Sequence, residues 1–482
     1  MRSLLLMAGM AAVLVAAQAA SAGVVMPATV VSPNPSPFAA CDNQGLAGID
    51  VNAEVEPWLA VDPANGNYAV AWQQDRWGDP NEGGAHGLVA WSSAGGQNTW
   101  APFTTCSGGT AANNGNYDRA SDVWLAYGPD GRLYQVALVF NWFDGRNAIT
   151  VSTSTDDGRT WGTPSVVVSS PQNSFTHGFD KESIVADPTR PGVAYVVWDR
   201  YSNQRPDYRS GNGQNADKGP AYISTTTDGG KTWSSAKPMY TGDNGTLGNQ
   251  LVVLNDGTLV DFFTNFIFVN GANGYAVNLE SVRSTNGGNS WSKPTVVTDL
   301  QPNGTIDPRD GTSLLRAGDS LFDVALGPNG ALYAVWEDSR FSGVDQVAFT
   351  KSTNGGSTWS TPVKIGKTPA NTNPLLTQAF TPSVDVSDNG TVAVTYYDFR
   401  SYSGGAALPV TYSAITSTSG GSSWGSEINL STSDEEFAPV AGGLMIGDYE
   451  GLAHSGNTFL TAFQVGNNAS DPTDIAVASF TP

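Results

Sequence analysis

Acidic residues and arginines stand together at the ends of several strand-like segments, in a chain of which only 14% of the residues are charged. An aromatic residue followed closely by Asp and Arg occurs at 72–76, 142–146, 198–200, 336–340 and 396–400. The planar guanidinium of Arg binds carboxylates with two parallel hydrogen bonds, so arginines gathered in one cleft can hold an acidic substrate. The predicted substrate-binding residues are Arg76, Arg119, Arg200, Arg340 and Arg400.

Acid–base chemistry needs carboxylates whose environments separate their pKa values, so that one donates a proton while another accepts it. The best candidates break the repeated pattern, as in Asp180-Lys181-Glu182 and Asp448-Tyr449-Glu450. The predicted catalytic residues are Asp180, Glu182, Asp338, Tyr397, Tyr449 and Glu450. The alternative is structural: each Asp pairs with an Arg next door and thereby holds neighbouring sheets together.

Short strands joined by a repeated turn must position these residues. Five copies of a Ser/Thr, Asp/Asn, Gly, Thr/Ser, Trp turn end at Trp161, Trp233, Trp291, Trp359 and Trp424, and a weaker sixth ends at Trp100. An Asp or Asn side chain can bind the turn backbone, Gly takes the positive φ angle, and Trp can fill the space between sheets. The repeat predicts an array of similar β units and a structural role for the turns.

The turn resembles the Asp box, or BNR repeat, of the sialidase-like β-propellers, from Ser92 to Trp424. The resemblance implies an all-β propeller of four-stranded antiparallel blades, with the boxes on one face and any site on the other. A sialidase of this family would use three arginines, a Tyr nucleophile activated by Glu, and an Asp acid/base. Its first Arg stands in an Arg-Ile-Pro motif, and here Glu56-Pro57-Trp58 takes that place.

The spacing of the box tryptophans fits four short strands for each unit. First strands are predicted at 56–62, 122–127, 182–187, 249–254, 322–326 and 382–386, and a seventh at 444–450. The last unit then lacks a strand, which residues 24–31 can supply and so close the ring. We therefore predict seven blades, with six as the alternative, in a single domain over residues 23–482.

The first 22 residues have the pattern of a secretion signal, with Arg2, an apolar run and Ala20-Ser21-Ala22. We expect a secreted protein, extracellular or periplasmic, with a disulfide between Cys41 and Cys106. The net charge of −21 argues against nucleic-acid partners and anionic membranes. A monomer that binds carbohydrate or a glycoconjugate is expected.

The function predicted is that of a sialidase-like glycoside hydrolase acting on a glycan with an acidic sugar. One alternative is a non-catalytic propeller that binds glycans or proteins; the other is a polysaccharide lyase, for which His86 and His177 are the residues to check beside a Tyr. The three histidines have no metal-ligand spacing, and no cofactor is expected. The many Asp and Asn loops leave room for a structural calcium ion, although no EF-hand-type loop is present.

Overall fold

The computed structural model describes residues 24–42, 48–78, 83–105, 116–142, 144–171, 177–202, 219–240, 245–268 and 275–482. The secretion signal and Cys106 lie outside these residues. Cys41 lies in the short helix α1 (Ala39–Asp42), and the described residues include no free cysteine. Because Cys106 lies outside them, its pairing with Cys41 stays a prediction. None of the helices in the described ranges is long and apolar enough to span a membrane.

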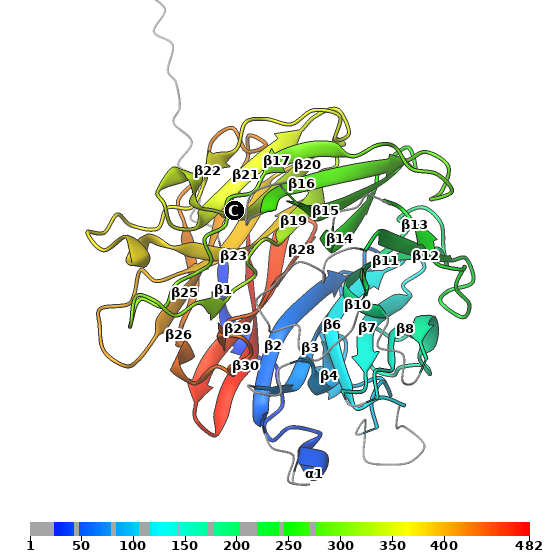
Figure 1. Ribbon diagram of the computed structural model, residues 1–482, viewed down its shortest axis with the longest axis horizontal. Coiled ribbons are helices and arrows are strands. Elements are labelled where there is room, and N and C mark those ends of the chain that lie inside the picture. Colours follow the sequence, from blue (N-terminus) through cyan, green and yellow to red (C-terminus); the bar gives the residue numbers. More distant parts are fainter. Residues whose placement is uncertain are drawn as a thin grey trace, which may run out of the picture.

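The fold is all-β and consists largely of four-stranded antiparallel sheets in which consecutive strands pair. Four such sheets stand alone (Figure 1). The first holds β10 (His177–Ala186), β11 (Ala194–Ser202), β12 (Ala221–Thr226) and β13 (Lys237–Pro238). The second holds β14 (Gly245–Val253), β15 (Leu259–Phe268), β16 (Tyr275–Ser284) and β17 (Thr295–Asp299). The third holds β19 (Phe322–Leu326), β20 (Leu332–Asp338), β21 (Gln346–Ser352) and β22 (Val363–Lys364). The fourth holds β23 (Ala379–Val386), β24 (Val392–Asp398), β25 (Pro409–Ser417) and β26 (Ile428–Asp434).

The remaining strands, apart from one short pair, join into a twelve-stranded sheet that contains both ends of the described chain. From the beginning of the chain it takes β1 (Val25–Val30), β2 (Ile49–Val61), β3 (Tyr68–Trp77), β4 (Ala85–Ser92), β5 (Gln97–Thr99), β6 (Arg119–Tyr127), β7 (Leu133–Phe140), β8 (Asn147–Ser154) and β9 (Ser165–Ser170). From its end it takes β28 (Gly451–Ser455), β29 (Thr458–Asn468) and β30 (Asp471–Phe480).

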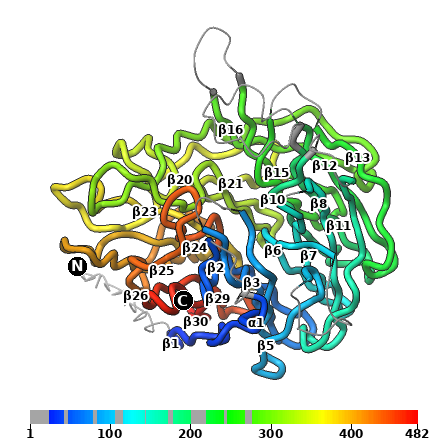
Figure 2. The backbone as a smooth tube through the Cα atoms, turned by 60° about the horizontal axis from the view of Figure 1, so that its bottom comes forward, coloured from blue at the N-terminus to red at the C-terminus, as the bar shows by residue number. Residues whose placement is uncertain are grey.

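The two ends of the chain pair with each other. Strand β1 lies antiparallel to β30, with Val25 opposite Phe480, and Figure 2 shows the blue and red segments side by side. A parallel contact between Ala53 and Thr473 adds β2 to the same junction. The prediction that residues 24–31 supply the missing strand of the last unit is therefore confirmed.

The predicted seventh first strand at 444–450 is wrong in position. Residues Leu444–Met445 form the two-residue strand β27, which pairs in parallel with β18 (Leu315–Arg316), and the inner strand β28 begins at Gly451. The local alternation of apolar residues cannot show whether 444–450 pair within the last sheet or with another segment, because their partner β18 comes from a distant irregular segment. His454 lies in β28 with its Nδ1 atom 2.6 Å from a carboxylate oxygen of Asp385.

The repeated turns close on themselves and then contact the neighbouring sheet. In the second full copy, Asp228 accepts hydrogen bonds from the Thr232 backbone N–H (2.9 Å) and the Thr232 hydroxyl (2.6 Å). The Gly230 N–H donates to the Thr226 hydroxyl, and the indole N–H of Trp233 donates to the Ser165 hydroxyl of β9 at 3.0 Å. The turn therefore links its own hairpin to the preceding sheet, in agreement with the structural role predicted.

The hydrophobic core lies between the faces of successive sheets. One cluster combines Val136 and Ile149 of β7 and β8 with Ile184 and Val196 of β10 and β11, all buried. Each sheet thus buries both faces, which leaves the ends of the strands and their connections as the places where polar chemistry can occur.

The turn geometry predicts that Asp228→Ala destabilises the protein, whereas Asp228→Asn does not. Alanine removes the acceptor of two turn hydrogen bonds, for which we expect a loss of about 1 kcal/mol in the free energy of unfolding. Asparagine should stay within about 0.5 kcal/mol, because Asn286 accepts the Ser290 N–H at 3.0 Å in the equivalent place of the next copy. Urea unfolding of the three proteins measures this difference, and equal losses in both variants would contradict it.

Candidate functional site

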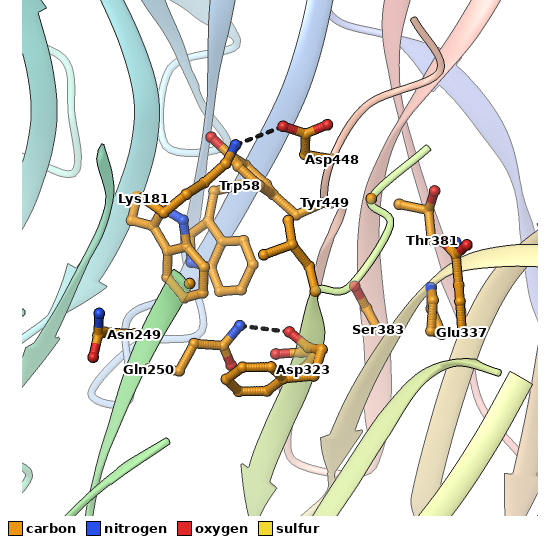
Figure 3. A pocket seen from close by; sticks show the side chains of 16 residues that line it. Trp58, Lys181, Asn249, Gln250, Asp323, Glu337, Thr381, Ser383, Asp448 and Tyr449 are labelled. Atoms are coloured by element: carbon orange, nitrogen blue, oxygen red, sulfur yellow. Dashed lines mark hydrogen bonds and ion pairs between the residues drawn. The ribbon is translucent and has the colours of Figure 1, made fainter. Parts of the chain in front are cut away.

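A pocket opens at the beginnings of the inner strands, the face on which the sequence places a site. Its lining includes Trp58 of β2, Trp124 of β6 and Lys181 of β10, together with Asp448 and Tyr449 from the segment that leads into β28. Figure 3 shows Lys181 reaching toward Asp448 on one side of this pocket, with Glu337 on the opposite side.

A bulge at the same place in five inner strands turns side chains toward this region. In β2, β6, β10, β14 and β23, two residues oppose a single residue of the next strand. The first residue of each bulge has a left-handed backbone: Glu56 (φ 54°), Asp122 (φ 50°), Lys181 (φ 47°), Gly248 (φ 72°) and Thr381 (φ 48°). Four of the five are not glycine, so the fold holds strained backbone here, a feature that is common at functional sites.

Asp448 is bound by two cations at once. The Lys181 Nζ atom lies 2.6 Å from Asp448 Oδ2 and 2.8 Å from Asp122 Oδ1. Arg316 binds the same Asp448 carboxylate through Nε (2.9 Å to Oδ1) and Nη2 (2.7 Å to Oδ2). Burial alone would raise the pKa of Asp448, but Arg316 and Lys181 lower it well below its ordinary value. Asp448 is therefore ionised at neutral pH.

Glu56, which has a raised pKa, lies beside this ionised group. Its Oε1 accepts the backbone N–H of Asp448 at 3.1 Å and lies 3.9 Å from Arg316 Nη2. Burial raises the pKa of Glu56 to about 7; the charges of Lys181 and Arg316 lower it, and those of Asp448 and Asp122 raise it further. The two neighbouring carboxyl groups thus differ in protonation below pH 7.

Aromatic rings line the side of the pocket next to these charges. Trp58 and Trp124 stack with their ring centroids 3.5 Å apart, and the Tyr449 ring meets both at about 6 Å. Burial, followed by the charges of Glu56 and Asp122, raises the pKa of Tyr449 well above its ordinary value. Tyr449 therefore keeps its phenolic proton, which does not suit the role of an ionised nucleophile.

Of the six predicted catalytic residues, Tyr449 alone lines the pocket. Asp180 and Glu182 flank Lys181 in β10; Glu182 is buried, and neither of its carboxylate oxygens has a hydrogen-bond partner among the described residues. Asp338 accepts hydrogen bonds from the Trp336 indole and from Arg340.

Tyr397 and Glu450 do contact each other, as expected for the tyrosine and the activating glutamate of a sialidase in the family that the sequence resembles. The Tyr397 hydroxyl donates to Glu450 Oε1 at 2.7 Å, but both residues are buried and Tyr397 belongs to the core between β24 and β29. Burial, followed by the charge of Glu450, raises the pKa of Tyr397 well above its ordinary value. The pair is thus part of the core and away from the pocket lining.

The five predicted arginines do not meet in one place. Arg340 and Arg400 bind the aspartates two residues before them, Asp338 and Asp398, and also the Asp299 backbone carbonyl and Glu427. Arg76 is buried and donates to Gln73; Arg119 lies over the rings of Trp77 and Trp142; Arg200 donates to the Tyr222 hydroxyl. Asp–Arg pairs are present, as the structural alternative predicted. Most of them, however, join an Asp and an Arg that stand two residues apart at the end of the same strand.

Sequence reasoning missed Lys181, Asp448, Arg316, Trp58 and Trp124 as site residues. Lys181 and Asp448 stood directly beside chosen candidates. The two tryptophans occupy matching places in Trp58-Leu59-Ala60 and Trp124-Leu125-Ala126, a repetition that could have revealed them. No repeat pattern marks Arg316.

Of the two histidines named for a lyase, His86 is not found beside Tyr449. His86 is buried with its ring 4.4 Å from that of Trp77, and it does not line the pocket. The side chain of His177 lies outside the described residues.

Two groups of three acids bring a carboxylate oxygen each within 4.8 Å of one another, the spacing that a bound cation needs. One is Asp319, Glu337 and Asp345, of which Glu337 lines the pocket; the other is Glu54, Asp471 and Asp474, where β2 meets β30. These are the groups among the described residues that could hold a metal ion.

The model of a BNR repeat-like domain matches residues 66–324, and no curated protein matches the chain. Among solved structures, a Hadza microbial sialidase is 15% identical, with 85% of this chain and 76% of that one covered and a TM-score of 0.48. A Penicillium chrysogenum α-L-arabinanase is 12% identical, with 94% and 98% covered and a TM-score of 0.47. A Streptococcus pneumoniae sialidase is 13% identical, with 77% and 69% covered and a TM-score of 0.46.

The ion pairs around Lys181 predict that Lys181→Met destabilises the protein by about 3 kcal/mol, because it leaves buried carboxylates without their cation. Asp122→Asn added to Lys181→Met should recover part of this loss, since Asp122 binds Lys181 directly. Urea unfolding of wild type, the two single variants and the double variant gives the coupling energy. Additive losses would contradict the arrangement described.

Proposed function

The chain belongs to the family of BNR repeat-like domains, and from that premise we propose that it is a glycoside hydrolase whose active site is the pocket between Trp58, Lys181 and Asp448. The family match covers residues 66–324 and thus more than half of the chain. Propeller folds of this kind serve several chemistries, so the activity has to be argued from the site itself.

The observation that carries the proposal is an ionised carboxylate that faces an open pocket beside stacked aromatic rings. Asp448 lines the pocket and is held ionised by Arg316 and Lys181. A carboxylate in this state can attack a sugar directly or activate a water molecule. Arg316 and Lys181 position it, and Glu56 fixes its backbone through the Asp448 N–H.

The aromatic side of the pocket suits a sugar ring. The apolar face of a pyranose or furanose packs on indole rings, and Trp58 and Trp124 offer such a surface next to Asp448. As Asp448 or its activated water attacks the anomeric carbon, the bond to the leaving oxygen breaks, and Tyr449, which keeps its proton, can donate a hydrogen bond to that oxygen. These roles place binding and bond cleavage within one pocket.

The charges around the pocket bear on the kind of sugar. The two cations, Lys181 and Arg316, are both paired with Asp448, and further acids, Asp323 and Glu337, also line the pocket. A substrate carboxylate would have to compete with Asp448 for the same cations. We therefore expect a neutral glycan to bind better than the acidic sugar that the sequence suggested.

For the fold, we infer a propeller of seven blades. The twelve-stranded sheet divides by sequence order into β2–β5, β6–β9 and the group β28–β30 with β1, and each of these has four strands like the four separate sheets. Secretion after removal of residues 1–22, as one domain, is part of the proposal.

The proposal predicts hydrolysis of at least one aryl glycoside from a panel of α-L-arabinofuranosides, neutral pyranosides, sialosides and uronides. Asp448→Asn should lower kcat at least about 1,000-fold, because the amide cannot serve as nucleophile or base. Trp58→Ala should mainly raise KM, because it removes the stacking surface. Product release measured by fluorescence gives both constants.

The matched control is Asp388→Asn, which makes the same chemical change at an exposed aspartate outside the pocket. It should leave kcat and KM unchanged. Glycan binding without turnover by the folded protein would contradict the hydrolase and favour the binding propeller. An active Asp448→Asn variant would remove Asp448 from the chemistry.

The variant Arg340→Ala tests whether the substrate binds at the arginines predicted from the sequence or in the pocket. Arg340 binds Asp338 and Asp299 and is absent from the pocket lining, so KM should change less than twofold. A KM raised tenfold or more, with unchanged thermal stability, would instead support the arginine site inferred from the sequence.

A further inference from the structure

Four oxygen-bearing side chains from three separate segments meet at the edge of the pocket. Asp319 and Thr305 belong to the long connection between β17 and β19, Glu337 lies near the end of β20, and Asp345 directly precedes β21. The carboxylate oxygens of the three acids lie within 4.8 Å of one another. Asp319 also lines a second hollow next to the pocket, which gives an ion a route from solvent.

Three oxygens of this group are buried without a hydrogen-bond partner among the described residues: Glu337 Oε2, Asp345 Oδ2 and the Thr305 hydroxyl. Glu337 is 2% exposed, and Asp345 and Thr305 are 0% exposed. Thr305 is neutral, so its orphan hydroxyl is an observation separate from the cluster of acids. A buried polar atom without a partner costs free energy, and an ion between these oxygens would satisfy all three.

The other oxygens of the acids are held by backbone N–H groups. The Thr381 N–H donates to Glu337 Oε1 at 2.8 Å, and the Asn303 N–H donates to Asp345 Oδ1 at 3.0 Å. The Thr305 N–H does the same for Asp319. Outer contacts of this kind orient the carboxylates of metal sites, and here they leave one oxygen of Glu337 and one of Asp345 free to point inward.

No positive charge compensates these acids within the described residues. Burial is the main cause that raises the pKa of Asp345 to about 6. Burial, Asp319 and Asp345 raise the pKa of Glu337 well above its ordinary value. A divalent cation would supply the missing charge.

We propose that Asp319, Glu337, Asp345 and Thr305 form a binding site for a calcium ion. Carboxylate and hydroxyl oxygens are hard ligands, as Ca²⁺ requires, and Ca²⁺–O distances of about 2.3–2.6 Å place opposite ligands up to about 5 Å apart. Ca²⁺ accepts about six to eight such oxygens in flexible geometry, whereas Mg²⁺ demands a near-ideal octahedron and gives up its water reluctantly.

The second acidic group is a weaker candidate. Both oxygens of Asp474 already accept hydrogen bonds, from the Ser32 hydroxyl and from Asn467. Two oxygens, Glu54 Oε2 and Asp471 Oδ1, are free, and no orphan hydroxyl joins them among the partnerless buried atoms of the described ranges. Because this group can still bind a cation, the experiment has to separate the two sites.

A calcium ion at the proposed site would fix the connection that carries Arg316. Asp319 lies three residues after Arg316, and the connection approaches Asp448 so closely that a side chain at Gly318 would come 2.7 Å from the Asp448 carbonyl oxygen. The ion would therefore stabilise the fold and position Arg316. The site stands on its own and does not depend on the proposed glycoside hydrolase activity.

The test is thermal unfolding of the full chain at pH 8 in EDTA and in 1 mM CaCl₂, with calcium titrated by calorimetry. We expect Ca²⁺ to raise the Tm of wild type by about 3–5 °C, and Mg²⁺ at the same concentration to raise it less. Thr305→Val, which removes one ligand without a change of charge, should weaken Ca²⁺ binding about tenfold.

Asp345→Asn distinguishes a cation site from a simple structural cluster. In EDTA this variant should unfold at a higher temperature than wild type, because it relieves the repulsion among the acids. In Ca²⁺ the order should reverse, and calorimetry should show one site fewer per chain. Asp319→Asn, at an exposed position where misfolding is not a concern, should show the same pattern.

Asp388→Asn is the control and should respond to calcium as wild type does. A calcium-dependent rise in Tm that is unchanged in Thr305→Val, Asp319→Asn and Asp345→Asn but lost in Asp471→Asn would move the ion to the second group and overturn the assignment. No calcium binding by wild type would also overturn it.

Discussion

The pocket depends on the carboxylate of Asp448 and the two cations that bind it. Lys181 arrives from β10, Arg316 from β18, and the backbone N–H of Asp448 donates to Glu56 of β2. Segments far apart in the sequence therefore meet at one residue near the end of the chain. A bidentate Arg–carboxylate pair has a fixed geometry, so the position of the segment before β28 follows from that of Arg316. The same contacts that shape the pocket also decide which of its acids is ionised.

The bulges explain how a repeated fold builds an unrepeated site. Five inner strands insert one extra residue at the same place, and the residue type differs from sheet to sheet: Glu56, Asp122, Lys181, Gly248 and Thr381. The backbone is thus nearly constant while the chemistry changes around the ring. Gly248 adopts its left-handed conformation without cost, whereas the other four store strain that the surrounding sheets must offset. Polar residues at strained positions indicate that their placement matters for more than folding.

Much of the fold could be predicted from the sequence because its signals are local. The Asp/Asn–Gly–Trp turns and the alternation of apolar residues identify hairpins without knowledge of distant partners. Counting the strands between these turns then predicted that residues 24–31 pair with the last sheet. The site was harder to predict. Asp180 and Glu182 were chosen because they break the repeated pattern at a strand start, but it is Lys181, at the bulge between them, that lines the pocket. Arg316 comes from an irregular segment with no periodic pattern, and its partner Asp448 lies 132 residues away. Tyr397 and Glu450 were both predicted as catalytic residues, yet burial in the core, which local sequence does not reveal, removes them from the pocket.

A chain with a net charge of −21 has to accommodate its acids one by one, and it does so in different ways. Asp228 is solvated and held by turn donors, Asp448 is neutralised by two cations, and burial raises the pKa of Glu56 to about 7. The group of Asp319, Glu337 and Asp345 has backbone donors on one side and no compensating charge on the other among the described residues. Such a group must either hold protons or bind a cation, and the choice depends on pH and on the ions present. The response of this protein to calcium and pH is therefore set at a few buried carboxylates beside the pocket, while the excess negative charge on the exterior chiefly keeps the molecules apart in solution.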